Sequence, residues 1–429
     1  MSFDGSSADG RRVIIASSDT HVGPLLEQLR DYCERAYLDE FDAFVGSCAQ
    51  QPGNVKAFED GATEVGPSFE RVVTPGHHDV YERLRQLDRD GVAGEVVFHG
   101  SQNGQPIPFL PSVASFTSSP LGQGARAEEL GRAGIRIYNR WLADFCSVEP
   151  HRHVGLAQSP IWDLDRSIDE IAWARAAGLR GVNFPAPRPS LPDHNDPVWD
   201  PFWSACEASD MPLNTHGGSE MVTAGIANYS GIGGRRLTAY ETHKFSSRGL
   251  WWMILGGVFE RHPKLKLILT EQIGVGAWLP LTMTELDELD GLVYLGPSEL
   301  SKSPSEYFRS NCYIGASFMS YIDAHSAVDN GFDRNYLWGS DFPHREGTYP
   351  WSILSLRMSL EDIPPDAIRR LVGQNLIDVF GLDRPALQTV ADRIGPTMHD
   401  LTTPLPTSEI PHEPGITEFS FAFRRGFAW

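Results

Sequence analysis

The 429-residue chain lacks the features that mark several large classes of protein. It has no apolar run long enough to cross a membrane, and residues 1–12 are polar, without the apolar core of a signal peptide. Its 36 basic residues stand against 56 acidic ones, a formal charge of −20. This balance argues against nucleic acid or an anionic membrane as a partner. These absences predict a cytoplasmic protein.

Cysteine is scarce, and no pair has C-x-x-C spacing. The five residues are isolated from one another, which excludes a disulfide framework and a cysteine-based zinc site. No G-x-G-x-x-G follows the first expected strand, so a dinucleotide-binding open sheet is disfavoured. What remains is an ordinary globular composition, with 41% hydrophobic and 21% charged residues.

Short apolar segments alternate with stretches that have apolar residues at helical spacing. The expected strands are 13–21, 94–98, 154–157, 179–184, 212–216, 265–270, 312–315 and 336–339. The expected helices include 25–37, 80–89, 127–145, 167–177, 201–208, 250–260, 279–289, 321–329 and 365–380. Repeated strand–helix units predict a parallel sheet, and eight of them predict a closed (β/α)₈, or TIM, barrel.

Long insertions are expected after the first, second and fifth strands, where Gly-, Pro- and Ser-rich excursions interrupt the alternation. We assign residues 1–386 to one barrel domain with these insertions. Residues 387–429 are a C-terminal extension, Pro-rich and then aromatic from Phe419 to Trp429. We expect this arm to pack on a neighbouring surface, including that of a second subunit.

The first strand ends in Asp19-Thr20-His21. Side chains two positions apart on a strand point to the same side, so Asp19 and His21 converge above the strand end. A carboxylate and an imidazole in this arrangement are suitable first ligands for a divalent metal.

Three later strands also end in polar groups: His216 after the fifth, Glu271 after the sixth and Asp341 after the eighth. In a TIM barrel these ends meet at the face that carries the active site. The resulting mixed nitrogen and oxygen set suits Zn²⁺ or Mn²⁺ with an open position for water or substrate: Asp19, His21, His216 and Asp341.

Four motifs carry a resemblance to a known family. They are D-T-H-V-G-P at 19–24, N-T-H-G-G at 214–218, T-E-Q-I-G-V-G-A-W-L-P at 270–280 and W-G-S-D-F-P-H at 338–344. From about residue 13 to 382 the chain resembles the amidohydrolase superfamily, in the branch that includes aminocarboxymuconate-semialdehyde decarboxylase and the resorcylate-type decarboxylases. The resemblance implies the same four metal ligands, proton transfer by Asp341, and a homodimer.

The chain departs from the family pattern at two strand ends. Asp19 stands where many members carry the first His of H-x-H, which keeps metal binding and favours Mn²⁺. Glu271 stands where well-known relatives carry a catalytic His. The fourth strand ends in Asn183 and Phe184, without a lysine that could be carbamylated to bridge two metals, so the resemblance implies one divalent ion.

Several residues have both a functional and a structural interpretation. Glu271 is a catalyst, a substrate contact or an acceptor for loop amides. His99 ends the second strand and either faces the site or caps the excursion behind it, and His344 is either at the site or a loop residue. We take Glu271 as catalytic together with Asp341. The candidate substrate-binding residues are His99, Asn183 and His344.

The expected function is that of a metal-dependent enzyme acting on a small molecule. The leading hypothesis is a non-oxidative decarboxylase of an aromatic or cyclic carboxylic acid. The alternative is a hydrolase of an amide, lactone or C–C bond that uses a metal-activated water. A third hypothesis is a metal-stabilised barrel that binds a ligand without catalysis; chelation would then lower stability without abolishing any turnover.

Overall fold

A computed structural model describes most of the chain: residues 11–50, 74–110, 121–188, 190–217, 233, 234, 237, 246–317, 319–344 and 346–411. Within them, eight parallel strands form one sheet, each beside the next in sequence. They are β1 (Ala16–Val22), β2 (Gly94–His99), β3 (His153–Ala157), β4 (Gly181–Asn183), β5 (Leu213–His216), β6 (Leu267–Thr270), β7 (Cys312–Ala316) and β8 (Tyr336–Trp338). The predicted (β/α)₈ barrel is confirmed.

The sheet closes between β1 and β8 together with the residues that follow β8. Thr20 and Phe342 form a parallel bridge, and Ser18 Oγ donates a hydrogen bond of 3.0 Å to the carbonyl oxygen of Leu337. We call this contact between β1 and residues 337–342 the seam. Because the seam brings the ends of the first and last strands together, it also brings Asp19 and Asp341 together.

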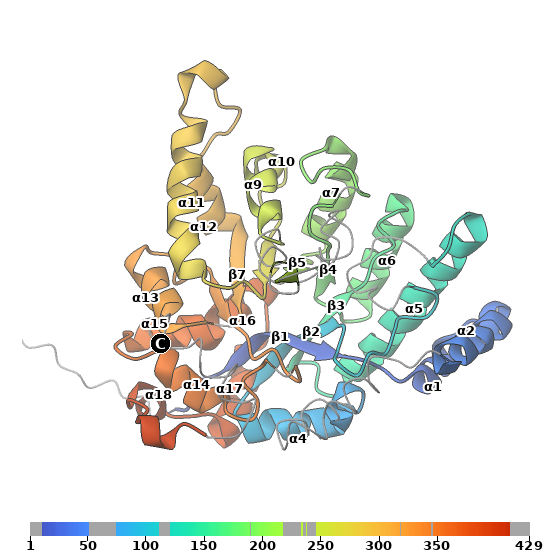
Figure 1. Ribbon diagram of the computed structural model, residues 1–429, viewed down its shortest axis with the longest axis horizontal. Coiled ribbons are helices and arrows are strands. Elements are labelled where there is room, and N and C mark those ends of the chain that lie inside the picture. Colours follow the sequence, from blue (N-terminus) through green and yellow to red (C-terminus); the bar gives the residue numbers. More distant parts are fainter. Residues whose placement is uncertain are drawn as a thin grey trace, which may run out of the picture.

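Helices surround the strands, as Figure 1 shows. One helix or a pair precedes each of β2 to β8: α4 (Val80–Asp90), α5 (Ala125–Ser147), α6 (Leu164–Ala176), α7 (Asp200–Ala208), α9 (Arg248–Leu255) with α10 (Val258–Arg261), α11 (Val275–Asp290) with α12 (Pro304–Asn311), and α13 (Tyr321–Asp329). After β8 come α14 (Ser352–Ser359) and a continuous helical run of α15 (Pro365–Arg369), a π-helical turn (370–374) and α16 (Asn375–Phe380).

Local sequence explains the ends of these helices. Asp79 caps α4 by accepting hydrogen bonds from the amides of Tyr81 and Glu82. Gly91 ends the same helix with φ of +75°, a conformation that glycine adopts without strain. Ser303 and Glu306 form a reciprocal capping box at the start of α12.

The first insertion contains more helix than expected. The segment 25–37 has only one helical turn, α1 (Leu26–Leu29), followed by two short 3₁₀ turns, whereas α2 (Leu38–Gln50) lies in a region we expected to be irregular. The reason is a narrow apolar face on α2: Phe41 is buried, and Phe41 and Phe44 both contact the ring of Phe109 in the insertion after β2.

The start of the C-terminal extension packs on the barrel. Helix α17 (Arg384–Ile394) buries Leu387, Val390 and Ala391. Leu387 lies against Gly94, the first residue of β2, so α17 covers the N-terminal end of the barrel. A short helix, α18 (Met398–Thr402), follows. The aromatic stretch from Phe419 lies outside the described residues, and the dimer arm stays a prediction.

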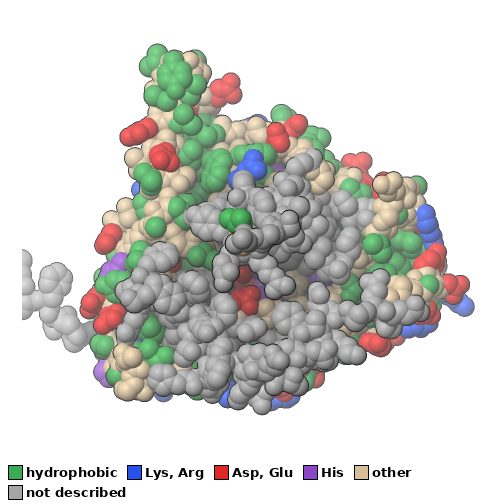
Figure 2. Space-filling model, viewed as in Figure 1, with side chains coloured by type: hydrophobic (Ala, Val, Ile, Leu, Met, Phe, Trp, Pro, Cys, Tyr) green, Lys and Arg blue, Asp and Glu red, His purple; other side chains and the backbone are tan. Residues whose placement is uncertain are grey.

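Helices α11 and α12 project beyond the rest of the molecule as a hairpin (Figure 1). Its tip exposes Val293, Tyr294 and Leu295, whose fractional exposures are 92%, 79% and 60%. Figure 2 shows this apolar tip with acidic side chains nearby. Among the described helices, none combines the length and apolar content needed to cross a membrane.

Candidate active site

The seam places two carboxylates side by side. The amide of Asp341 donates a 2.9 Å hydrogen bond to the carbonyl oxygen of Asp19, and the amide of His21 donates one of 2.7 Å to the carbonyl oxygen of Phe342. Gly339 is required here, since a Cβ atom at this position would lie 2.8 Å from Cβ of Asp19. This close approach explains the Gly in W-G-S-D.

Two acidic residues that follow strands have a left-handed backbone conformation. Asp341 has φ of +54° and Glu271 has φ of +58°. This conformation costs an L residue about 1–3 kcal/mol, and the surrounding structure must impose it. At both positions it directs a carboxylate into the barrel mouth just after a strand ends.

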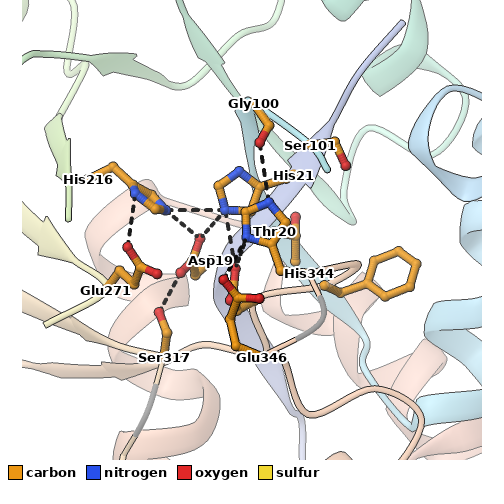
Figure 3. A network of polar contacts seen from close by, with 12 residues as sticks. Asp19, Thr20, His21, Gly100, Ser101, His216, Glu271, Ser317, His344 and Glu346 are labelled. Carbon is orange, nitrogen blue, oxygen red and sulfur yellow. Dashed lines mark hydrogen bonds and ion pairs between the residues drawn. The ribbon is translucent and has the colours of Figure 1, made fainter. Parts of the chain in front are cut away.

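Three side chains predicted as ligands meet at one point. Nε2 of His21 lies 3.2 Å from Oδ1 of Asp19, Nε2 of His216 lies 3.3 Å from the same oxygen, and the two nitrogens are 3.2 Å apart. Oδ1 of Asp341 is 3.3 Å from Nε2 of His21. Figure 3 shows His216 on one side of Asp19 and His21 on the other.

These separations fit a shared cation better than hydrogen bonds. Oδ1 of Asp19 and both carboxylate oxygens of Asp341 are buried and have no hydrogen-bond partner among the described residues. Ligand atoms about 2.1 Å from one ion at angles of roughly 90–110° lie about 3.0–3.4 Å apart. The residues present therefore fit a divalent metal ion, as two groups of possible ligands: Asp19, His21, His216; and His21, Asp341, His344.

Each imidazole is oriented by a backbone carbonyl. Nδ1 of His216 is 2.6 Å from the carbonyl oxygen of Gly217, and Nδ1 of His21 is 3.4 Å from that of His99. Donation from Nδ1 directs Nε2 toward the cluster, the usual arrangement of metal-bound histidine. Ser317, after β7, donates a 2.5 Å hydrogen bond to Oδ2 of Asp19 and so turns Oδ1 toward the histidines.

Negative charge is in excess at this site. Four carboxylates lie here, those of Asp19, Asp341, Glu271 and Glu346, and oxygens of the last three lie within 4.8 Å of one another. Burial and the neighbouring Asp341 and Asp19 raise the pKa of Glu271 well above its ordinary value, although His216 opposes this. Burial opposes the charge on His216, but Asp19 and Glu271 outweigh it and raise the pKa of His216 to about 9. A divalent cation would relieve this excess.

The other sequence candidates lie at different distances from the cluster. His344 is inside it: its ring stacks on that of His21, with centroids 3.9 Å apart, and its Nδ1 is 2.9 Å from Oδ1 of Asp341. His99 offers its carbonyl oxygen, while its ring packs edge-on against Tyr138 of α5. Asn183 is buried at the end of β4.

Sequence reasoning missed two residues of the site. Ser317 follows β7 directly, so the strand-end rule that found the other candidates would also have found it. Glu346 lies five positions after Asp341, and its Oε1 is 4.0 Å from Nδ1 of His344. Glu346 lacks a strand-end signal because it sits in the loop beyond the seam.

Comparison with known proteins identifies the family. The family model described as amidohydrolase matches residues 77–382, which is more than half of the 429 residues. The chain belongs to the amidohydrolase family, and the expected resemblance and metal-dependent enzyme class are confirmed. The match begins after β1, so Asp19 and His21 lie outside the matched segment.

Solved structures share the barrel. 5-Carboxyvanillate decarboxylase from Sphingomonas paucimobilis is 22% identical, with a TM-score of 0.60 over 86% of this chain and 100% of that one. An amidohydrolase from Mycobacterium avium subsp. paratuberculosis K-10 is 20% identical, with a TM-score of 0.61 over 87% and 100%. A dihydroxybenzoic acid decarboxylase from Polaromonas sp. JS666, with bound manganese and 2-nitroresorcinol, is 15% identical, with a TM-score of 0.57 over 87% and 98%. At these identities the similarity establishes the fold.

Proposed function

We propose that the chain is a metal-dependent, non-oxidative decarboxylase of an aromatic or cyclic carboxylic acid. The observation that carries this proposal is the pair of buried carboxylates, Asp19 and Asp341, whose Oδ1 atoms lie 3.2 and 3.3 Å from Nε2 of His21. Such a site would bind a divalent ion and place a carboxylic acid beside it. Metal-dependent decarboxylation uses both the ion and the acid. The decarboxylases among the structural neighbours support this reaction class.

In this proposal, one divalent ion is held by four side chains. Two carboxylates and two imidazoles suit manganese or zinc, and the carboxylate share favours manganese. The ion, when bound, supplies positive charge that a substrate carboxylate and an adjacent oxygen can chelate. The proposed ligands are Asp19, His21, His216 and Asp341.

Asp341 is the proposed acid, because it is buried beside the ligand cluster, with Oδ1 3.3 Å from Nε2 of His21 and 2.9 Å from Nδ1 of His344. As the bond to the carboxyl group breaks, its electron pair stays on the substrate carbon and CO₂ leaves. A proton from Asp341 then forms the new C–H bond, and Asp341 regains a proton from water before the next turnover. Atoms and charge balance without an oxidant.

Glu271 and Glu346 make hydroxyl groups the favoured partners at this part of the site. Their oxygens lie within 4.8 Å of each other and of Asp341, and burial raises the pKa of Glu271. Carboxyl groups accept hydrogen bonds from hydroxyls and repel further carboxylates. This supports a hydroxylated aromatic acid as substrate, with His344, His99 and Asn183 as further proposed contacts.

One observation favours hydrolysis as a second candidate. Glu271 is a buried carboxyl 3.4 Å from Nδ1 of His216, with its pKa raised toward the range of a general base. A base at that position takes a proton from water as the water attacks a carbonyl. An amide, lactone or C–C bond would then be cleaved, with a new carboxylic acid as product.

The two reactions differ in their products. Manganese-loaded protein is incubated in D₂O with hydroxylated aromatic acids labelled with ¹³C in the carboxyl group, and in parallel with lactones and amides. Decarboxylation predicts ¹³CO₂ together with one deuterium on the carbon that carried the carboxyl group. Hydrolysis of a lactone or amide, with no ¹³CO₂ from any acid, would replace the proposal by the second candidate.

A further inference from the structure

Next to the proposed ligand His21 lies a fully buried arginine that the proposed mechanism does not use. Arg83 of α4 pairs with Glu95 of β2 through two hydrogen bonds, from Nε (2.7 Å) and Nη2 (2.8 Å). Its Nη1 donates to the carbonyl oxygens of His21 (2.8 Å) and Gly76 (3.1 Å). Its guanidinium carbon lies 4.9 Å from the ring centroid of Phe342.

We infer that Arg83 is a positioning residue for the metal site, acting through the backbone of His21 and the ring of Phe342. His21 is a proposed ligand, and Phe342 directly follows Asp341, so Arg83 contacts both sides of the seam. The amide of His21 already donates to the carbonyl oxygen of Phe342. Because Arg83 also donates to the carbonyl oxygen of His21, the peptide units on both sides of His21 are held by hydrogen bonds. The backbone that carries the imidazole is therefore fixed in position.

The arginine is itself held rigidly. Glu95 accepts from Arg83 and also lies 2.9 Å from Nδ1 of His153 on β3. Burial opposes the charged form of Glu95, but Arg83 and His153 together outweigh it and lower the pKa of Glu95 to about 2. The guanidinium fork therefore has a fixed ionic partner on the barrel wall and cannot swing away from His21 without leaving that carboxylate unpaired.

Arg152 is a matched control at the other end of the barrel. It is 1% exposed, and its Nε and Nη2 donate to the carbonyl oxygens of Ala93 and Val92, which precede β2. Its Nη1 pairs with Asp88 at 2.9 Å. Both buried arginines thus pair with a carboxylate and donate to two backbone carbonyls, but only Arg83 contacts the seam.

The inference rests on the proposed metal site, so the test first measures manganese binding by the wild-type protein. Arg83→Met and Arg152→Met are then titrated with Mn²⁺ by electron paramagnetic resonance, at a temperature where circular dichroism shows both to be folded. We expect Arg83→Met to bind Mn²⁺ about 10–100-fold more weakly, the scale for removing a residue that orients a ligand. Arg152→Met should match wild type within about twofold, and only Arg83→Met should change the absorption bands of the Co²⁺-substituted protein.

A second variant covers the case in which Arg83→Met does not fold. Arg83→Lys keeps the charge beside Glu95, but one ammonium group cannot reproduce the fork to Glu95 and the bond to His21. It should also weaken Mn²⁺ binding. Wild-type affinity and an unchanged Co²⁺ spectrum in a folded Arg83 variant would overturn the positioning role alone. Failure of the wild-type protein to bind Mn²⁺ would overturn the proposed metal site together with this inference.

Discussion

The backbone amide of Asp341 donates a hydrogen bond of 2.9 Å to the carbonyl oxygen of Asp19. The two carboxylates proposed as metal ligands are therefore attached to adjacent, hydrogen-bonded backbones, although one follows the last strand and the other lies within the first. The hydrogen bond that helps to close the barrel therefore also brings the two proposed ligands together. A variant that opens the seam should lose metal affinity together with stability.

Asp341→Asn should abolish turnover and weaken metal binding. The amide keeps the size of the carboxyl group but removes both the negative charge of the ionised form and the ability to carry a proton to the substrate. Steady-state kinetics and metal analysis of the same preparation check this. Asp323→Asn is a suitable control, because Asp323 is a buried carboxylate that caps α13 through Ser320. Normal turnover by Asp341→Asn would remove it as the acid.

Glu271→Gln separates three roles of that residue. As a general acid or base, its loss should lower kcat by about 10²-fold or more while the metal stays bound. As a substrate contact, its loss should raise KM with kcat unchanged. If neither constant moves, Glu271 is an acceptor for loop amides, and the departure from the family at this strand end has no catalytic meaning.

Ser317→Ala should weaken metal binding by about 10–100-fold, because Asp19 loses the hydrogen bond that orients it. Unfolding in urea should show only a small loss of stability. Ser359→Ala is the matched control. Ser359 is also buried and donates a hydrogen bond to the carbonyl oxygen of Met319, which is not a proposed metal ligand. Equal metal affinity in the two variants would show that Ser317 has no orienting role.

Lowering the pH should reduce the free energy of unfolding, because Glu95 becomes protonated. Its pKa in the folded protein is about 2, against an ordinary value of 4.5, so its contribution to stability is present above pH 4.5 and is lost as the pH falls toward 2. Glu95→Gln lacks this contribution at every pH. The difference in urea midpoint between the two proteins should therefore shrink below pH 4.5, and a constant difference would contradict the assigned pKa.

Much of the fold followed from the sequence, because strand–helix alternation determines a parallel barrel and a parallel barrel brings its strand ends together. That rule placed Asp19, His21, His216 and Asp341 at one face, and in the structure each lies 3.2–3.3 Å from at least one other of the four. The same rule applied to β7 would have included Ser317.

Other features depend on contacts between distant segments, which periodicity does not encode. The stacking of His344 on His21 arises from the loop beyond β8, and the edge-on contact of the His99 ring with Tyr138 joins β2 to α5. Arg83 resembles an ordinary helical arginine in the sequence. Its role becomes visible only when Glu95, His21 and Phe342 are seen around it.

The most direct test of the account is elemental analysis of gently purified protein, wild type beside His216→Ala. The account predicts one equivalent of manganese or zinc per wild-type chain and loss of most of it in the variant, since His216 supplies one of four ligands. Circular dichroism must show that the variant is folded. A wild-type protein that holds no divalent metal even after incubation with Mn²⁺ or Zn²⁺, or a variant that keeps its full equivalent, would contradict the assignment of the site.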